Sequence, residues 1–375
     1  MKLFDVYPRY SIEPVKGEGV HVWDKNGTKY LDLYGGHAVI SVGHGHPHYT
    51  QRIREQLNRL GFYSNSVIMP IQDELASHLG RLADLPDYTL FLCNSGAEAN
   101  ENALKLASFH TGKKKVIVFE KGFHGRTSLA VEATDSTKIE APINHTGNFT
   151  RLPLNDIDAL RSAFDDTVAA VMLEGIQGIG GIHVPTAEFL HEIRRLCDQY
   201  EAVMILDEIQ SGYGRSGKFF AFQHANVQAD IISMAKGMGN GFPIGGILIA
   251  PHFEASAGLL GTTFGGNHLA CAAGLAVLEI MEQEELIANA QEIGDDLRRE
   301  LTKIQGVVDV RGLGLMIGID LEKEAKEIRS ALLFDHHIFT GSASNPNTLR
   351  ILPPLSLAKS HANQFLNSLT TVLNR

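Results

Sequence analysis

Short apolar runs alternate with segments of helical periodicity through the middle of the chain, and this alternation constrains the fold more than any other feature. TLFLCN precedes AEANENALKLASFH, and VAAVMLEG precedes AEFLHEIRRLCDQY. Further apolar runs are KKVIVFE, EAVMILDE, ADIISMAK and GGILIAP. Such alternation is typical of a mostly parallel sheet covered by helices. The sequence therefore predicts an α/β fold.

The two ends of the chain differ from this middle part. VHVWDKNGTKYLDLYGG resembles a small hairpin, whereas a long helical pattern from about residue 267 leads to short strands at VVDVRGLGLMIGIDL and TLRILPPL. We expect a large domain over residues 46–265 and a smaller α+β domain over residues 266–375. Residues 1–45 are expected to pack beside the smaller domain. The length of 375 residues agrees with this division.

Composition favours small-molecule partners. The formal net charge is −10, which gives no general attraction to nucleic acid or to an acidic membrane surface. Cys93, Cys197 and Cys271 are far apart, which excludes a disulfide framework and matches a reducing compartment. No stretch has the roughly 18 apolar residues of a membrane span, and the first residues lack the apolar core of a signal peptide. We expect a cytoplasmic protein.

A lysine and an aspartate follow two of the apolar runs. Asp207 ends AVMIL, and Lys236 follows DIISMA, so both are expected at the carboxyl edge of the sheet, where α/β enzymes bind ligands. A desolvated lysine can lose its proton and attack carbonyl groups. The alternative for Asp207 is a structural role as a helix cap or in an ion pair. The alternative for Lys236 is binding of a phosphate, although the local glycines do not form a P-loop.

Ser95, Gly96 and Ala97 stand between an apolar run and a helical segment, with Glu98 three residues after the serine. This spacing predicts a capping box. The same hydroxyl and backbone N–H groups at a helix N-terminus also suit a phosphate. The two interpretations are compatible.

Seven segments, in order, resemble those of the class III pyridoxal-phosphate aminotransferases of fold type I, and within them the N-acylornithine aminotransferases such as acetylornithine aminotransferase. These segments are GEGVHVWDKNGTKYLDL, GHGHP, NSGAEANENALKLA, FHGRT, LDEIQSGYGRSGKFFAF, AKGMGNGFPIGG and TTFGGNHLACAAGLAV. The resemblance covers nearly the whole chain. It implies transfer of the side-chain amine of N-acetylornithine or N-succinylornithine to 2-oxoglutarate. The products would be a semialdehyde and glutamate, in arginine biosynthesis.

The resemblance also assigns residues to pyridoxal phosphate. Lys236 would hold the cofactor's aldehyde and later shuttle a proton, while Asp207 would pair with the pyridine nitrogen. Gln210 would bind the phenolic oxygen. Phe123 and Ile209 would pack on the two faces of the ring, although core packing is the ordinary role of a lone phenylalanine.

Phosphate binding is implied for Ser95, Gly96 and Ala97, and for Thr263 of a neighbouring subunit. Thr262 would lie beside the substrate. These roles imply a homodimer with shared active sites. The alternative for both threonines is a helix cap.

Two arginines would bind substrate carboxylates, because a guanidinium binds such groups in a bidentate manner. Arg126 would hold the distal carboxylate and Arg350 the α-carboxylate of glutamate. Their alternatives are a solvated arginine and a surface ion pair. Glu174 would pair with Arg350 until glutamate arrives.

The chain departs from the family pattern at Gly175, Ile179 and His268, where the family has proline, an acid and proline. Open alternatives within the fold are an ω-aminotransferase for ornithine, 4-aminobutyrate or a diamine, and an isomerase like glutamate-1-semialdehyde aminomutase. A third alternative is a cofactor-binding scaffold that has lost catalysis. A nicotinamide dehydrogenase is disfavoured because no G-x-G-x-x-G motif follows a first strand. The motif GHGHPH is interpreted as a loop and not as a metal site, because glycine and proline interleave its histidines.

Overall fold

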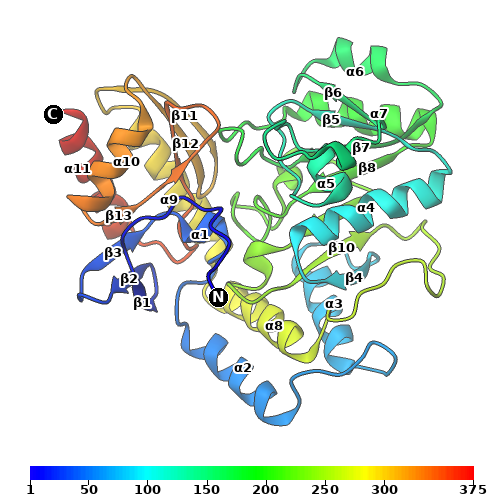
Figure 1. Ribbon diagram of the computed structural model, residues 1–375, viewed down its shortest axis with the longest axis horizontal. Helices are drawn as coiled ribbons and strands as arrows, with labels where there is room; N and C mark the ends of the chain where they lie inside the picture. Colours follow the sequence, from blue (N-terminus) through cyan, green and yellow to red (C-terminus); the bar gives the residue numbers. More distant parts are fainter.

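A seven-stranded sheet occupies the middle of the chain in the computed structural model, which describes residues 1–375 (Figure 1). The strands follow the order β4 (Thr89–Cys93), β10 (Gly245–Ile249), β9 (Ile231–Met234), β8 (Val203–Asp207), β7 (Val168–Glu174), β5 (Lys115–Phe119) and β6 (Phe149–Leu152). Strand β10 runs antiparallel to β4 and β9, and all other neighbours are parallel. The mostly parallel sheet predicted from the apolar runs is confirmed.

Helices cover both faces of this sheet, as its apolar strands require. Ile205 of β8 belongs to the same apolar cluster as Ala103 of α4 (Gly96–Thr111), whereas its neighbours Met204 and Leu206 cluster with Ile193 of α7 (Ala187–Tyr200). Successive side chains of a strand point to opposite faces. The short helices α5 (Ser128–Glu132) and α6 (Ile157–Ala163) accompany α4 and α7, respectively.

The C-terminal part forms a separate four-stranded antiparallel sheet. Its order is β11 (Val307–Leu313), β12 (Met316–Leu321), β15 (Thr348–Ile351) and β14 (Gly341–Ser342). The helices of this part are α9 (Leu286–Leu301), α10 (Ala325–Phe334) and α11 (Lys359–Leu373). The buried helix α8 (His268–Gln283) leads into it from the large sheet. Figure 1 shows these C-terminal elements gathered on one side of the molecule.

The N-terminal strands join the C-terminal part. Strands β1 (Pro14–Glu18), β2 (His21–Asp24) and β3 (Lys29–Asp32) pair antiparallel, and β13 (Ile338–Phe339) extends them by pairing parallel to β3. The turn α1 (Gly35–Ala38) follows, and the helices α2 (Pro47–Arg59) and α3 (Pro70–Leu82) pack against α8. Three short 3-10 turns complete the elements: η1 (Pro142–Asn144), η2 (Ala221–His224) and η3 (Lys236–Met238).

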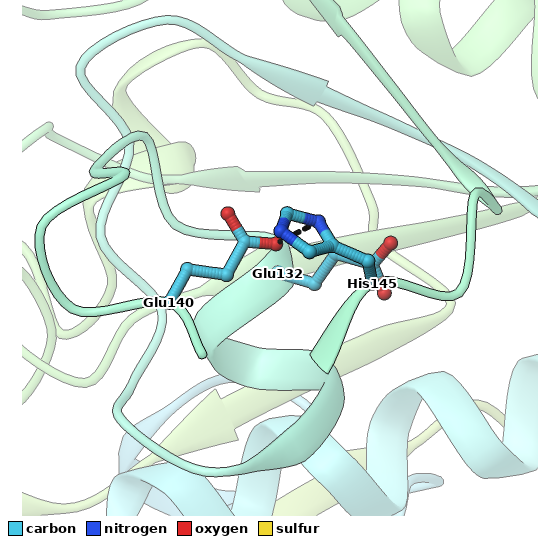
Figure 2. Close-up of side chains that lie close together, drawn as sticks. All are labelled: Glu132, Glu140 and His145. Carbon is cyan, nitrogen blue, oxygen red and sulfur yellow. Dashed lines mark ion pairs between the residues drawn. The ribbon is translucent and has the colours of Figure 1, made fainter. Parts of the chain in front are cut away.

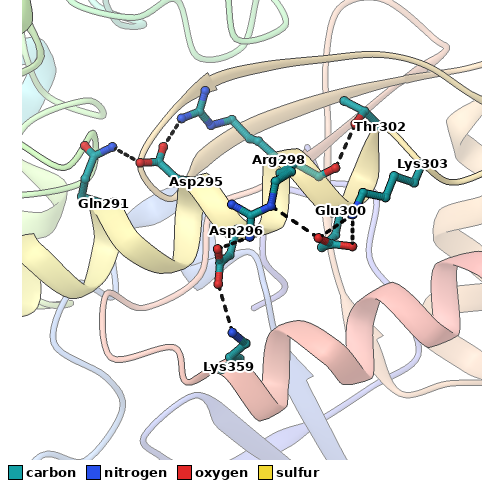
Figure 3. A network of polar contacts seen from close by, with 9 residues as sticks. Gln291, Asp295, Asp296, Arg298, Glu300, Thr302, Lys303 and Lys359 are labelled. Atoms are coloured by element: carbon teal, nitrogen blue, oxygen red, sulfur yellow. Dashed lines mark hydrogen bonds and ion pairs between the residues drawn. The ribbon is translucent and has the colours of Figure 1, made fainter.

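Helix α9 carries a network of polar contacts on its exposed side (Figure 3). Gln291 donates to Asp295 over 2.6 Å, and Lys303 pairs with Glu300 over 2.8 Å. Lys359 of α11 reaches Asp296 over 3.2 Å and so links the two helices. Exposed pairs of this kind contribute little to stability because solvent screens them, so the network mainly solvates this side of the helix.

None of the helices combines the length and the apolar character that crossing a bilayer requires.

Candidate active site

Charged side chains meet where β7, β8 and β9 end. Asp207 is the last residue of β8 and lies in register with Glu174, the last residue of β7. Lys236 follows the end of β9 by two residues and has φ of 44°, in the left-handed region that lysine seldom adopts. The strand ends predicted for Asp207 and Lys236 are confirmed.

A cavity of about 170 Å³ lies at this edge and is lined by ten residues. Eight of them belong to the set predicted from the sequence: Gly96, Ala97, Phe123, Glu174, Asp207, Ile209, Gln210 and Lys236. His124 and Gly125 complete the lining. The structure therefore gathers most of the predicted residues, which come from distant parts of the chain, around one cavity.

The N-terminus of α4 faces this cavity. Ser95 caps the helix because its hydroxyl accepts from the N–H of Glu98 at 3.2 Å, while the Glu98 carboxylate returns to the N–H of Asn94 at 2.6 Å. The first N–H groups of a helix have no partner within it, so those of Gly96 and Ala97 suit an anion. Gly96 must lack a side chain here, since a Cβ would lie 2.8 Å from the Ile209 side chain.

Two residues that sequence reasoning missed hold Asp207. Its Oδ2 atom accepts from His124 Nδ1 and from Asn100 Nδ2, both at 2.8 Å, and its Oδ1 atom accepts from the N–H of Ile209 at 3.0 Å. The aspartate is 3% exposed. The sequence could have indicated both residues, because His124 follows Phe123 in FHGRT and Asn100 lies one helical turn after Gly96. These contacts fix the carboxylate in orientation.

Glu174 is buried and lines the cavity. Its carboxylate accepts from the N–H of Phe123 at 3.0 Å and from the N–H of Gly178 at 2.8 Å. Burial raises the pKa of Glu174 to about 7, with Asp207 adding to the rise, while His124 and the two N–H groups oppose it. This carboxyl group therefore titrates near neutral pH.

Lys236 forms no hydrogen bond or ion pair with another side chain. Desolvation lowers the pKa of Lys236 and the nearby Arg350 cation lowers it further, while Asp207 and Glu174 act in the opposite direction. A lowered pKa increases the fraction of neutral amine, which is the nucleophilic form.

The predicted ion pair between Glu174 and Arg350 is absent. Both oxygens of Glu174 are engaged by backbone N–H groups instead. Arg350 donates its Nε–H to the carbonyl of Ser342 at 2.5 Å, and its Nη1 lies 3.4 Å from Gln210 Oε1. The prediction was wrong because the resemblance did not reveal that two backbone N–H groups lie beside the Glu174 carboxylate and donate to it.

Arg126, Thr262 and Thr263 lie outside the lining of the cavity within this chain. Arg126 is exposed and unpaired. Thr262 accepts from Asn94 Nδ2 at 3.2 Å and lines a different pocket, while Thr263 is exposed. Neither threonine caps α8, whose N-cap is Asn267, so the alternative role considered for them is wrong.

The positions that depart from the family pattern have different surroundings. Gly175 faces Glu208, and a Cβ at this position would lie 2.4 Å from the Glu208 carboxylate. The glycine therefore leaves the space that the buried Glu208 side chain occupies. The Ile179 carbonyl accepts from the N–H of Ser344 at 2.9 Å. His268 is the first residue of α8.

Other groups of potential metal ligands are satisfied within the protein. Glu132, Glu140 and His145 lie close together (Figure 2), but Glu132 accepts from Thr146 and Gly147, and His145 pairs with Glu140 at 3.0 Å. The histidines of GHGHPH diverge to three different acids: His44 to Asp32, His46 to Glu284 and His48 to Glu279.

The model of the family described as aminotransferase class-III matches residues 6–373. This chain belongs to the class-III aminotransferase family. It is 40% identical to the acetylornithine aminotransferase of Listeria innocua serovar 6a over 380 residues, covering 100% of this chain and 98% of that relative.

Solved structures resemble this class-III aminotransferase over nearly all of its length. The acetylornithine aminotransferase of Elizabethkingia anophelis has a TM-score of 0.87 and 30% identity, covering 98% of this chain and 95% of that one. The ornithine aminotransferase of Toxoplasma gondii has a TM-score of 0.90 and 28% identity, covering 99% and 91%. That protein has PLP at partial occupancy in its active site. The aminotransferase fold predicted from the sequence is confirmed.

Proposed function

We propose that this enzyme transfers the side-chain amine of an N-acylornithine to 2-oxoglutarate with pyridoxal phosphate as cofactor. The products are the N-acylglutamate semialdehyde and glutamate, as arginine biosynthesis requires. One observation carries the proposal: a single cavity joins a free lysine, an aspartate held by three donors and an open helix N-terminus. The acetylornithine aminotransferases among its relatives support the choice of substrate.

The residues around the cavity fit pyridoxal phosphate. The N–H groups of Gly96 and Ala97 and the Ser95 hydroxyl would hold the phosphate, and Asp207 would bind the protonated pyridine nitrogen. Gln210 would bind the phenolic oxygen. Phe123 and Ile209 line the same cavity and would pack on the ring. When bound, the cofactor supplies an electron sink for the charge that develops at the substrate carbon.

Lys236 would perform two tasks. Its neutral amine would hold the cofactor's aldehyde carbon until a substrate amine takes that place. The released amine would then take the proton from the substrate carbon that bears the transferred nitrogen. Asp207 contributes by keeping a negative charge at a fixed position, because its three donors prevent the carboxylate from turning away.

Two arginines would hold the substrates at different ends. The α-carboxylate of N-acylornithine lies far from the reacting amine, so exposed Arg126 would bind it. Glutamate reacts at its α-carbon, and buried Arg350 beside Gln210 would bind its α-carboxylate. Glu174 lines the same cavity and would shape the substrate site.

We also propose a cytoplasmic homodimer whose subunits share their sites, with Thr263 reaching the partner's phosphate and Thr262 lying beside the substrate. Exposed apolar side chains next to the threonines support it, namely Phe264 and Phe62, whose rings pack together. The three cysteines are buried and free.

Residues 46–265 would form the large domain and residues 266–375 the small one. Residues 1–45 would lie beside the small domain, as the pairing of β3 with β13 supports.

Steady-state kinetics with N-acetylornithine, N-succinylornithine and free ornithine test the substrate, each with and without 2-oxoglutarate. We expect an N-acylornithine to give the highest kcat/KM and turnover to require the oxo acid. Borohydride reduction should attach the cofactor to Lys236, whereas Lys218→Ala, which alters an exposed lysine, should leave that labelling intact. A reduced adduct on another lysine would contradict the assignment.

A further inference from the structure

The turn that carries Lys236 has an unfavourable backbone conformation. Lys236 and Asn240 have φ angles of 44° and 46°, in the left-handed region that costs energy for residues other than glycine. Backbone hydrogen bonds join Met238 to Ala235 and Gly239 to Lys236, but they stay within the turn and do not tie it to other parts of the chain. Such a conformation persists only where the surroundings hold it, so contacts from outside the turn decide where the lysine points.

Three consecutive residues between α1 and α2, here called the strap, supply such contacts: Ser41, Val42 and Gly43. Ser41 donates its hydroxyl to the Gly237 carbonyl at 2.7 Å. Asn240 binds the strap in return. Its Oδ1 atom accepts from the N–H groups of Ser41 at 2.8 Å and Val42 at 3.1 Å, and its Nδ2 atom donates to the next carbonyl, that of Gly43, at 2.9 Å.

Burial makes these bonds costly to break. Ser41 and Val42 are each 2% exposed, and Asn240 is 6% exposed. Loss of the Asn240 amide would leave two buried N–H groups without an acceptor. The strap also packs closely on the turn, since a Cβ at Gly237 would lie 3.5 Å from the Ser41 side chain and 3.3 Å from that of Tyr213.

The strap is also held from its other side by the C-terminal part of the chain. The Ser41 carbonyl accepts from the N–H of Leu355 at 2.7 Å, and the carbonyl of Leu33, ahead of α1, accepts from the N–H of Leu352 at 2.8 Å. Leu352 and Leu355 follow β15 and are completely buried. The Lys236 turn is therefore fixed, through the strap, to a buried segment that lies outside the large sheet.

We propose that Asn240 is a positioning residue for Lys236. By binding the strap, it holds the lysine turn in the left-handed conformation that keeps the amine at the catalytic cavity. The inference deepens the proposed function and rests on its assignment of Lys236 as the lysine that holds the cofactor. Asn240 does not line the cavity itself, so it acts only through the placement of the lysine.

Asn240→Gly separates the side chain from the backbone conformation, because glycine adopts a positive φ freely. The test measures how fast apoenzyme attaches pyridoxal phosphate to Lys236, followed by absorbance at saturating cofactor. We expect the first-order rate to fall about tenfold or more, since a small misplacement of a reacting group is costly. Pyridoxine 5′-phosphate has an alcohol in place of the aldehyde and cannot attach to an amine. Its binding should change by less than about threefold, because Asp207 and the N-terminus of α4 are unaltered.

Asn226→Gly is the matched control. Asn226 has φ of 52°, is exposed and forms no side-chain hydrogen bond, so the substitution removes the same atoms without removing a contact. Its attachment rate should equal that of wild type. Equal losses for pyridoxal phosphate and pyridoxine 5′-phosphate in Asn240→Gly would indicate a general loss of structure, and an unchanged attachment rate would mean that the turn needs no strap. Either result overturns the proposal.

Ser41→Ala is a second variant, which removes one hydroxyl and keeps the bonds of Asn240. It should slow attachment about fivefold, because the strap then holds Gly237 less firmly. In the double variant with Asn240→Gly, the further loss from Ser41→Ala should be less than about twofold, since both residues act through one strap. Losses that multiply would mean that the two residues act independently, and would contradict the strap.

The attachment measurement needs no amino donor, so its outcome is separate from that of the proposed reaction. If the cofactor attaches to Lys236 at the expected rates while no N-acylornithine reacts, the proposed function fails and the role of Asn240 stands. If N-acylornithines react but Asn240→Gly attaches the cofactor as fast as wild type, the role of Asn240 is wrong and the proposed function stands.

Discussion

Asn100 is expected to act as a positioning residue for Asp207. Asn100→Ala should weaken cofactor binding and lower kcat, each by about tenfold or more, because a hydrogen bond to a charged group contributes roughly 1.5–3 kcal/mol. Titration of the apoenzyme with pyridoxal phosphate measures the first effect and single-turnover rates the second. Asn102→Ala, on the same helix but bonded to the Glu98 carbonyl, is the control. Equal effects of both substitutions would argue against the role of Asn100.

Asp207 shows how far single residues could be predicted. Its place at the end of an apolar run gave its position at the sheet edge, but its hydrogen-bond donors His124 and Asn100 come from other elements. Such contacts depend on how α4 and the loop after β5 approach β8. The same limit explains why the pair between Glu174 and Arg350 was predicted in error. Local motifs do not reveal which donor a buried carboxylate will find.

Glu208 should make the stability of the protein depend on pH. Burial raises the pKa of Glu208 to about 7, against hydrogen bonds from Ser211, Ala221 and Phe222. The unfolded carboxyl ionises at a lower pH, so between these pKa values the folded state holds the extra proton and stability falls as pH rises. Above about pH 7 the cost is constant, on the order of 3 kcal/mol.

Glu208→Gln removes this ionisation. Relative to wild type, the unfolding free energy of the variant should improve between pH 5 and pH 8, whatever the pH-independent effect of the amide. Urea unfolding of the two apoenzymes across this range measures the difference. A difference that does not change with pH would mean that Glu208 has an ordinary pKa in the folded state.

At the scale of elements, the central strands were predictable because β7, β8 and β9 are buried along their length and read as apolar runs. Strand β6, with the sequence FTRL, was not predicted, since it lies at the sheet edge and its residues are only partly buried. The antiparallel direction of β10 was also missed. The alternation of strands and helices does not record the direction of a strand that follows a long loop.

The N-termini of α4 and α7 give a matched test of capping against cofactor binding. Ser95 caps α4, and Thr186 caps α7 by accepting from the N–H of Phe189 at 3.2 Å. Ser95→Ala and Thr186→Ala should each destabilise the apoenzyme by about 1 kcal/mol. Only Ser95→Ala should also weaken binding of pyridoxal phosphate, measured by absorbance titration. Equal cofactor affinities in the two variants would exclude a phosphate contact by the Ser95 hydroxyl.

At the scale of the whole molecule, the site is distributed over the entire chain. Residues from α4, from the loop after β5 and from the ends of β7, β8 and β9 line one cavity, and Arg350 of β15 contacts Gln210 beside it. The pairing of β3 with β13 joins the first strands to the last part. The apolar runs alone predicted that Asp207 and Lys236 lie at one edge of the sheet, whereas the place of the other site residues followed only from the resemblance to a family. Nothing in a single chain completes the surroundings of Thr263, which stays exposed beside Phe264.

Mixing two inactive variants tests whether Thr263 acts across a subunit boundary. Thr263→Val removes the hydroxyl from the partner's site and Lys236→Ala removes the lysine from its own site. In a mixed dimer, the site with Lys236 from the threonine variant and Thr263 from the lysine variant is intact. Random reassortment would therefore restore about a quarter of wild-type activity, since half of the dimers are mixed and each has one intact site. If Thr263 instead serves its own chain, every site carries one lesion and the mixture shows only the average of the two variants. Co-refolding at equal concentrations followed by activity measurement separates these outcomes, and light scattering on the same sample verifies the dimer.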